Sequence, residues 1–253
     1  METHILYQKS LILNFDPDRH TYTVNGEIVD SVTSILGQTI AKPALIPWAT
    51  KTMAENLMGL WKAGVSYDEI QIKEMLNTAK QIYKYKSEKA ADIGTLVHEW
   101  ISKYIQGLKP PMPINKEMQG GVKAFLKWTK ENKIQFKLTE RKVFSKKYKF
   151  AGTCDFTAII NGKNFVGDIK TSNAIYNESF YQVAAYTYAL QEEFPKMKPD
   201  GNIIVRCGKD GSLEVKSVKN GEVKENFKAF LGALAIYRRA KALKQLYFNQ
   251  KNK

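Results

Sequence analysis

Residues 151–171 read AGTCDFTAIINGKNFVGDIKT, two apolar runs rich in β-branched residues on either side of an Asn-Gly pair. Asn161 and Gly162 favour a two-residue hairpin turn, because both central positions of that turn need positive φ angles, which Asn and Gly tolerate best. We therefore expect antiparallel strands over 151–160 and 163–171.

The register of a two-residue loop pairs Ile160 with Lys163 and, counting outward, sets Asp155 directly opposite Asp168. Side chains alternate between the two faces of a strand, so Lys170 projects to the same side as Asp168. Facing like charges destabilise a sheet, so this patch calls for further positive charge, which a divalent metal would supply. The alternative interpretation is that Asp168 and Lys170 form only a surface ion pair.

The chain has two further Asn-Gly pairs, at 25–26 and 220–221, which serve as internal controls. The same counting brings at most one acid into each facing pair, Val24 with Glu27 and Lys219 with Glu222. The facing acids are therefore particular to the hairpin at 151–171.

Composition indicates a globular protein without a membrane partner. With 253 residues and 43% hydrophobic content, the chain can build a sizeable core. No apolar run approaches the roughly 18 to 20 residues that span a bilayer, and the start of the chain lacks a signal-peptide pattern, so we expect a cytoplasmic protein that is not secreted. Cys154 and Cys207 are too few for a disulfide framework or a four-cysteine cluster.

The formal net charge of +14 is unevenly distributed. Residues 121–150 contain ten Lys or Arg against two Glu, and residues 224–253 contain eight against one Glu. Such stretches favour a polyanionic partner, because each phosphate contact releases condensed counterions. We predict a nucleic acid, and the alternative is a lysine-rich surface that serves solubility.

Hydrophobic periodicity predicts the other elements. Strands are expected at 5–15, 21–24, 27–29, 134–143, 147–153, 202–207 and 212–218. Helices are expected at 45–60, 67–84, 88–106, 116–131, 177–193 and 222–248. This order predicts an α/β fold with a central mixed sheet flanked by helices. We expect an N-terminal β-hairpin and helical elaboration over 1–90 and a core over 91–253, packed as one globular unit.

A histidine lies on the helix expected at 88–106. Its apolar residues recur every three or four positions, which is typical of a buried stripe, and His98 lies at the edge of that stripe. Gly94 shares its flank, and glycine inside a helix costs about 1 kcal/mol unless something must approach closely. By itself, such a histidine is more typical of a structural residue.

Four short motifs follow one another in the chain: Gly-x-x-x-His at 94–98, Gly-x-x-Asp at 152–155, Asp-x-Lys-Thr at 168–171 and Gln-x-x-x-Tyr at 182–186. Together they resemble the PD-(D/E)XK nuclease superfamily, specifically the RecB-like exonuclease branch with its phage-encoded and mitochondrial genome maintenance exonuclease-like members. The resemblance implies a restriction-endonuclease-like core. Many RecB-like nucleases hold an iron–sulfur cluster with four cysteines, and no such cluster is expected here.

The resemblance also implies a metal site. Asp155 and Asp168 would be ligands, completed by the backbone carbonyl of Ile169 and the imidazole of His98. Mg²⁺ prefers oxygen ligands and keeps several waters, so two carboxylates with open positions suit it. An imidazole ligand favours acceptance of Mn²⁺ as well.

In such a nuclease, Lys170 acts with Asp155 and Asp168 in catalysis. Lys170 would orient or deprotonate the attacking water and stabilise developing charge, and the sequence leaves base and electrostatic roles open. Glu140 is a candidate for a further acid near the site, and the sequence does not decide its role.

The helix after the hairpin is expected to contact DNA. Gln182 and Tyr186 are four residues apart and share a helix face, where an amide and a phenol can bind phosphates without reading sequence. The alternative is that Tyr186 belongs to the core. Thr171 and Ser172 are expected to contact a neighbouring phosphate.

These observations predict a metal-dependent DNA exonuclease with little sequence specificity that acts in phage or genome DNA processing, recombination or repair. Its partners would be single-stranded, end- or flap-containing DNA and a recombination or replication protein, in the host cytoplasm if phage-encoded. The alternatives are a flap or branch endonuclease and an inactive DNA-binding accessory protein. The presence of Asp155, Asp168, Lys170 and Gln182 argues against the inactive alternative.

Overall fold

The computed structural model describes residues 1–251, with side chains to residue 248. It divides into two compact units. The core unit contains Met1–Ile40 and the chain from Val97 onward, and the helical unit contains Ala41–Leu96. This division differs from the expected boundary at residue 90, because the N-terminal strands pair with strands of the C-terminal part and so belong to the same unit.

The core unit contains all the strands of the described chain. They are β1 (Glu2–Leu6), β2 (Leu11–Asp16), β3 (Thr21–Val24), β4 (Glu27–Ser31), β5 (Gln135–Ser145), β6 (Phe150–Ile160), β7 (Lys163–Lys170), β8 (Gly201–Cys207) and β9 (Leu213–Lys219). The helices of the chain are α1 (Val32–Thr39), α2 (Leu45–Leu60), α3 (Glu69–Ile105), α4 (Lys116–Asn132), α5 (Asn177–Glu193) and α6 (Asn220–Lys251).

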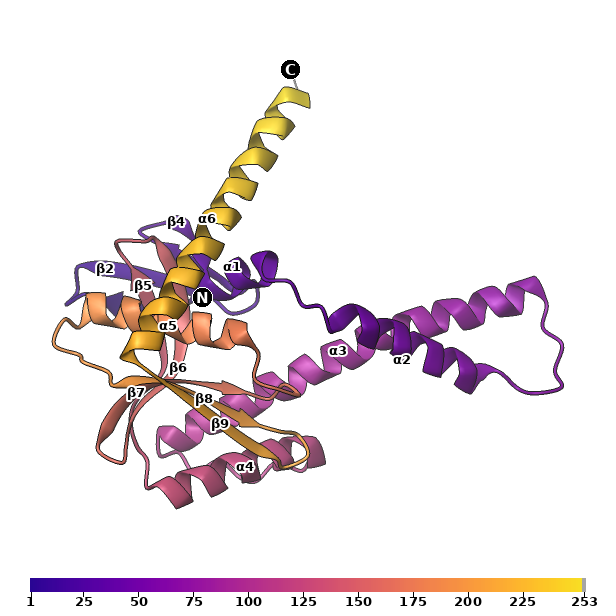
Figure 1. Ribbon diagram of the computed structural model, residues 1–253, viewed down its shortest axis with the longest axis horizontal. Helices are drawn as coiled ribbons and strands as arrows, with labels where there is room; N and C mark the ends of the chain where they lie inside the picture. Colours follow the sequence, from indigo (N-terminus) through magenta and orange to yellow (C-terminus); the bar gives the residue numbers. More distant parts are fainter. Residues whose placement is uncertain (252–253) are drawn as a thin grey trace. The chain divides into compact units, whose positions relative to one another are not determined.

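The strands form one mixed sheet, in the order β1-β2-β3-β4-β6-β7-β8-β9, with β5 also paired to β6 (Figure 1). The β4–β6 and β7–β8 pairs are parallel, and the other pairs are antiparallel. The predicted α/β class with a mixed sheet flanked by helices is therefore confirmed.

The predicted hairpin forms with the predicted register. Asn161 and Gly162 have φ angles of 50° and 76°, as a two-residue turn requires. Pairing runs from Ile160 with Lys163 to Phe156 with Gly167. The ladder ends there, one step before Asp155 and Asp168 would face each other as backbone partners.

Of the two control turns, one is confirmed and one is wrong. The turn at 25–26 pairs Val24 with Glu27, as predicted. At 220–221 there is no hairpin, because Asn220 begins α6. The apolar residues after it recur every three or four positions and are buried, at Val223, Phe227, Phe230 and Leu234. This helical pattern outweighs the local Asn-Gly turn signal.

Two other predicted elements differ from the structure. The strand expected at 5–15 is two strands, because residues 7–9 adopt positive φ angles and form a tight turn. The helices expected at 67–84 and 88–106 are one continuous helix, α3. The sequence between them contains neither Gly nor Pro, so nothing in it ends a helix.

Helices cover both faces of the sheet in the core unit (Figure 1). On one face, α1, α5 and α6 bury a cluster that includes Phe150, Val166 and Tyr186. On the other face, Trp128 of α4 lies 5.9 Å from the ring of Phe156. Cys154 and Cys207 are buried free thiols, as expected.

The helical unit contains α2 and most of α3. Its aromatic contacts join Trp48 to Tyr83 at 6.4 Å and Trp61 to Tyr67 at 5.1 Å between ring centroids. Within residues 1–251, no helix combines the length and the apolar character needed to cross a membrane.

The close packing at the Phe156–Gly167 pair predicts that a substitution at Gly167 lowers stability. A methyl group at Gly167 would lie 2.0 Å from Cζ of Phe156, so the ring must move. We expect Gly167→Ala to lower the free energy of unfolding by about 1–3 kcal/mol, measured by urea denaturation. Gly37→Ala in α1 is the matched control, because nothing lies within 4 Å of its added methyl group. Equal stability of both variants would contradict this packing.

Candidate functional site

The candidate site lies where β6 and β7 separate. On one side β6 pairs with β5 along most of its length. On its other side β6 pairs with β4 through Phe150 and Ala151, and with β7 through residues 156–160. Within the described chain, residues 152–155 have no strand partner on that side. The Gly-x-x-Asp motif occupies this opening, which we call the strand fork.

Side chains fill the fork in place of a backbone ladder. Oδ2 of Asp155 accepts a hydrogen bond from the backbone N–H of Ile169 at 2.7 Å. The hydroxyl groups of Tyr22 and Thr153 lie 2.8 Å apart, which links β3 to the fork. Ligand sites in open α/β sheets occur at such points, because diverging strands leave a crevice between them.

Gly152 is needed at the fork because an aromatic ring packs against it. A Cβ at this position would lie 2.5 Å from Cε1 of Tyr186. Tyr186 is only 1% exposed, so its ring is part of the core. The glycine of the Gly-x-x-Asp motif therefore lets α5 approach β6 closely.

Asp168, Lys170 and Gln182 form one hydrogen-bond network. Nζ of Lys170 donates to Oδ1 of Asp168 at 3.0 Å and to Oε1 of Gln182 at 3.1 Å. Nε2 of Gln182 donates to the same Asp168 oxygen at 3.1 Å and to the hydroxyl of Tyr186 at 3.0 Å. The predicted convergence of Asp168 with Lys170 is thus present, and Gln182 fixes both from α5.

One oxygen of this network has no hydrogen bond. Oδ2 of Asp168 is fully buried and lacks a hydrogen-bond partner, although Nζ of Lys170 lies 2.8 Å from it as an ion pair. A buried carboxylate oxygen is costly to leave without a hydrogen bond or a coordinated cation. The ion pair with Lys170 is therefore what compensates this buried oxygen.

A second group of ligand atoms joins His98 to two acids. Single ligand atoms of His98, Glu140 and Asp155 all lie within 4.8 Å of one another, and Nδ1 of His98 is 3.5 Å from Oδ2 of Asp155. His98 comes from α3, Glu140 from β5 and Asp155 from β6. Three elements far apart in sequence thus meet at the fork.

Glu140 is the acid that the sequence suggested near the site without assigning it a role. Thr139 pairs with Phe156 and Arg141 with Cys154, so Glu140 lies opposite Asp155 in register. Its φ of 48° is unusual, because it is a non-glycine residue inside a strand. Such a conformation costs about 1–3 kcal/mol and is found mainly where function maintains it. Counting paired residues between β6 and β5 would have set Glu140 opposite Asp155. The sequence between these strands contains no turn signal that fixes their register, so this count was not possible from sequence.

The raised pKa values of the three acids show that nearby positive charge does not offset the cost of burying them. Burial raises the pKa of Asp168 to about 6 and, with the charge of Asp155, raises the pKa of Glu140 to about 7. Burial also raises the pKa of Asp155. Burial and the charge of Lys170 lower the pKa of His98 to about 4, so its imidazole is neutral at pH 7.

The donor set fits a divalent cation. The carboxylates of Glu140 and Asp155 cluster with the neutral imidazole of His98, while the buried carboxylate of Asp168 lies outside that group and pairs with the ammonium of Lys170. Carboxylate oxygens suit Mg²⁺, and the added imidazole suits Mn²⁺. Asp155, Glu140 and His98 can therefore hold a cation that removes the cost of burying these charges, and the role of Asp168 as a ligand stays a prediction.

Lys170 is cationic in this environment. Burial lowers its pKa, but the charges of Asp168 and Asp155 outweigh burial and raise the pKa above its usual value. The ammonium is therefore fixed between Asp168 and Gln182 as a positive charge.

The residues predicted to contact DNA differ in burial and in hydrogen bonding. Tyr186 was expected to contact a phosphate, but its burial prevents this and its hydroxyl instead binds Gln182. The hydroxyl of Ser172 donates to the carbonyl of Ala174 at 2.8 Å and so stabilises the loop after β7. Thr171 is half-buried at the end of the same strand. The roles of Gln182, Thr171 and Ser172 toward DNA stay predictions.

Comparison with known proteins identifies no family for this chain. No family model and no curated protein matches it. Among solved structures, the protein SSO0001 matches with 14% sequence identity and a TM-score of 0.31, over 72% of this chain and 83% of that chain. A likeness at this level bears on neither fold nor function.

The geometry predicts that Glu140 contributes to cation affinity. We expect Glu140→Gln to weaken Mn²⁺ binding about tenfold or more, measured by titration calorimetry, because a ligand oxygen loses its charge. Glu131→Gln on α4 is the control, since this exposed glutamate pairs with Lys127 away from the fork. Unchanged Mn²⁺ affinity in Glu140→Gln would place Glu140 outside the metal site.

Proposed function

We propose that this protein is a metal-dependent DNA exonuclease of the PD-(D/E)XK type, in the RecB-like branch, which acts in phage or genome DNA processing, recombination or repair. The observation that carries the proposal is the convergence of Asp155, Asp168 and Lys170 at the strand fork, with His98 beside them. These residues come from three of the four motifs on which the resemblance rests.

Each side chain has a distinct part in the proposed reaction. Asp155, Asp168 and His98 would hold Mg²⁺ or Mn²⁺, with Glu140 and the Ile169 backbone carbonyl as additional ligands. A cation held there would polarise the scissile phosphate and assist an attacking water during in-line displacement. Asp155 is anchored by the Ile169 N–H, so its second oxygen stays free to bind.

Lys170 has an electrostatic part in the proposed reaction. An ammonium has three N–H donors, and Asp168 and Gln182 accept two of them. The ammonium also forms an ion pair with the second Asp168 oxygen at 2.8 Å, so Lys170 is a fixed positive charge, which favours an electrostatic role in transition-state stabilisation. Gln182 acts here as a positioning residue, because its amide holds Lys170 and Asp168 together.

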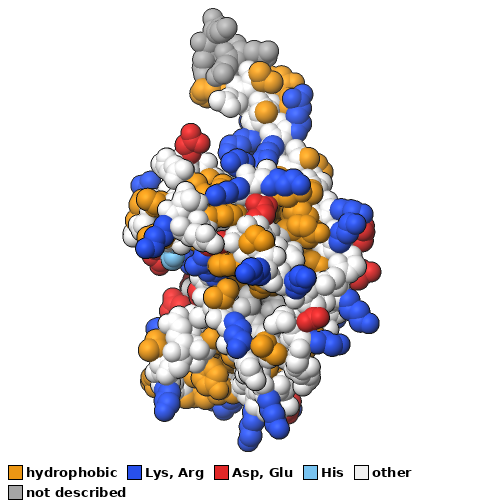
Figure 2. Space-filling model, turned by 90° about the vertical axis from the view of Figure 1, so that its left-hand side faces the viewer, with side chains coloured by type: hydrophobic (Ala, Val, Ile, Leu, Met, Phe, Trp, Pro, Cys, Tyr) orange, Lys and Arg blue, Asp and Glu red, His pale blue; other side chains and the backbone are white. Residues whose placement is uncertain are grey.

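The charge distribution supports a nucleic-acid substrate. Lys and Arg side chains spread over the face shown in Figure 2. With a net charge of +14, the protein would attract a phosphodiester backbone without reading its sequence. A substrate strand can then be cleaved with little sequence specificity.

The first test is cleavage of end-labelled single- and double-stranded DNA with Mg²⁺, Mn²⁺ or EDTA. We expect cleavage only with metal, and we expect Asp168→Asn and Lys170→Gln each to lower its rate about a hundredfold or more. Lys163→Gln, an exposed lysine at the far end of the hairpin, should cleave like the wild type. Metal-dependent cleavage that survives both fork substitutions would contradict the proposal.

The second test separates an exonuclease from the alternative flap or branch endonuclease. We expect linear DNA to be degraded and covalently closed circular DNA of the same sequence to stay intact, because an exonuclease needs an end. The products are measured on a denaturing gel. Cleavage of the closed circle, or of flapped DNA only at its junction, would favour the endonuclease alternative.

A further inference from the structure

A basic pocket lies in the core unit apart from the strand fork. Its volume is about 660 Å³, and its cationic lining residues are Lys146, Lys149, Arg238 and Lys241. The lining also includes two acids, Glu27 and Asp30. We call this cavity the basic pocket, and its positive charges outnumber its negative ones.

The two basic stretches of the sequence meet at this pocket. Lys146 and Lys149 belong to the stretch at 121–150 and lie in the turn between β5 and β6. Arg238 and Lys241 belong to the stretch that begins at 224, and they lie three residues apart on one face of α6. Charges that are separate in the sequence are therefore concentrated at one place in the fold.

Arg238 is held in a fixed orientation at the pocket wall. Its Nη2 donates to the backbone carbonyls of Tyr148 and Lys149, both at 2.8 Å, and its Nε lies 3.6 Å from Oδ2 of Asp30. Nη1 has no hydrogen bond or ion pair with the part of the chain that the structure describes. Its N–H groups are therefore available to an oxygen ligand in the pocket.

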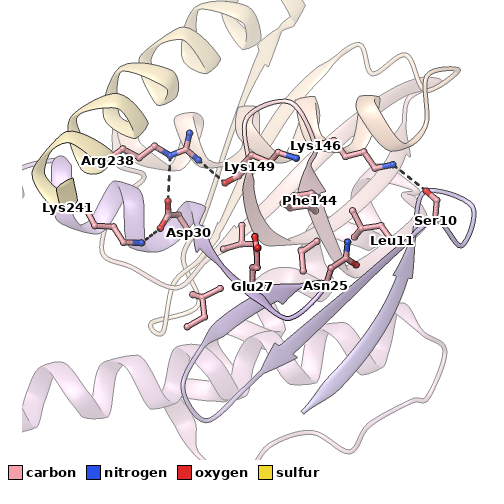
Figure 3. Close-up of a pocket in the computed structure, with 13 residues that line it drawn as sticks. Ser10, Leu11, Asn25, Glu27, Asp30, Phe144, Lys146, Lys149, Arg238 and Lys241 are labelled. Carbon is pink, nitrogen blue, oxygen red and sulfur yellow. Dashed lines mark hydrogen bonds and ion pairs between the residues drawn. The ribbon is translucent and has the colours of Figure 1, made fainter. Parts of the chain in front are cut away.

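The remaining cations lie around the same space. Figure 3 shows Lys241 reaching from α6 to Asp30 on one side of the pocket and Lys146 reaching Ser10 on the other, at 2.9 Å and 3.3 Å. Asp30 is shared between Lys241 and Arg238, so one carboxylate balances two cations. Lys146 and Lys149 are exposed and lack a carboxylate partner within the described residues.

The pocket lies at a distance from the fork that a bound DNA can span. Lys149 immediately precedes β6, and Asp155 is six residues further along the extended chain. At about 3.3 Å per residue, the separation is about 20 Å. This is the length of about six base pairs along a duplex axis, at 3.4 Å per step.

We propose that the basic pocket binds the phosphodiester backbone of DNA several nucleotides away from the phosphate held at the strand fork. This inference rests on the proposed function for the identity of the strand. Cations on a turn and a helix suit phosphates, because phosphate contacts fix the position of a strand without reading its sequence. The pocket thus holds the strand while the fork acts on its end.

The test measures DNA binding rather than cleavage. A labelled 20-bp duplex, and one of its strands alone, are titrated with full-length protein carrying Asp168→Asn, by fluorescence anisotropy at several salt concentrations. Lys146→Gln with Lys149→Gln should weaken binding of the duplex tenfold or more. The slope of log K against log salt should fall by about 1.8 for the duplex, or about 1.4 for the single strand.

Matched variants separate the pocket from general charge. Lys163→Gln with Lys219→Gln removes the same charge from exposed lysines outside the pocket lining. We expect these variants to keep the wild-type slope, and Lys146→Arg with Lys149→Arg to keep the wild-type affinity. Comparable thermal melting of all variants shows that each is folded.

Three outcomes would overturn the inference. A control pair that lowers affinity as much as the pocket pair would indicate that general charge, and not the pocket, binds the DNA. Unchanged DNA binding in the pocket pair excludes a DNA contact there. Loss of binding to labelled poly-glutamate with DNA binding intact would assign the pocket to an acidic peptide. If the pocket pair weakens DNA binding as expected but the wild-type chain cleaves no DNA, only the proposed nuclease function is overturned.

Discussion

The separation of β6 from β7 after the Phe156–Gly167 pair is the constraint on which the site depends. If the ladder continued, Asp155 and Asp168 would be neighbours on a closed sheet with their backbones paired. Because it ends, the Asp155 carboxylate takes the place of a strand and binds the N–H of Ile169. Two glycines make this possible, since Gly167 admits the ring of Phe156 and Gly152 admits the ring of Tyr186. The opening is therefore built by packing as much as by pairing.

Much of the fold follows from local signals in the sequence. The Asn161-Gly162 turn determines both its hairpin and the register of the five pairs beyond it, because a two-residue loop leaves no freedom in the count. The helices at 45–60 and 177–193 have the predicted bounds. The hairpin expected at Asn220-Gly221 fails because a long buried helical pattern overrides the turn signal.

The candidate site is only partly readable from sequence. His98, Asp155, Asp168 and Lys170 lie in short motifs, and the structure brings them together at the fork. Glu140 reaches the same place through a strand pairing with a register shift near residue 137, which no local pattern reveals. Its positive φ depends on the tertiary environment, because glutamate has no intrinsic preference for it. Sequence thus predicts the residues of the site better than the contacts that orient them.

The parallel pairing of β4 with β6 has a consequence for synthesis of the chain. Ser31 pairs with Ala151, so the N-terminal strands join the central sheet through a partner made 120 residues later. At about 5–20 residues per second, the ribosome takes about 6–24 s to produce that partner. During this interval the edge of β4 is an exposed template for pairing with other chains. The interval between synthesis of the N-terminal strands and synthesis of β6 is therefore the stage at which this chain is most prone to aggregate.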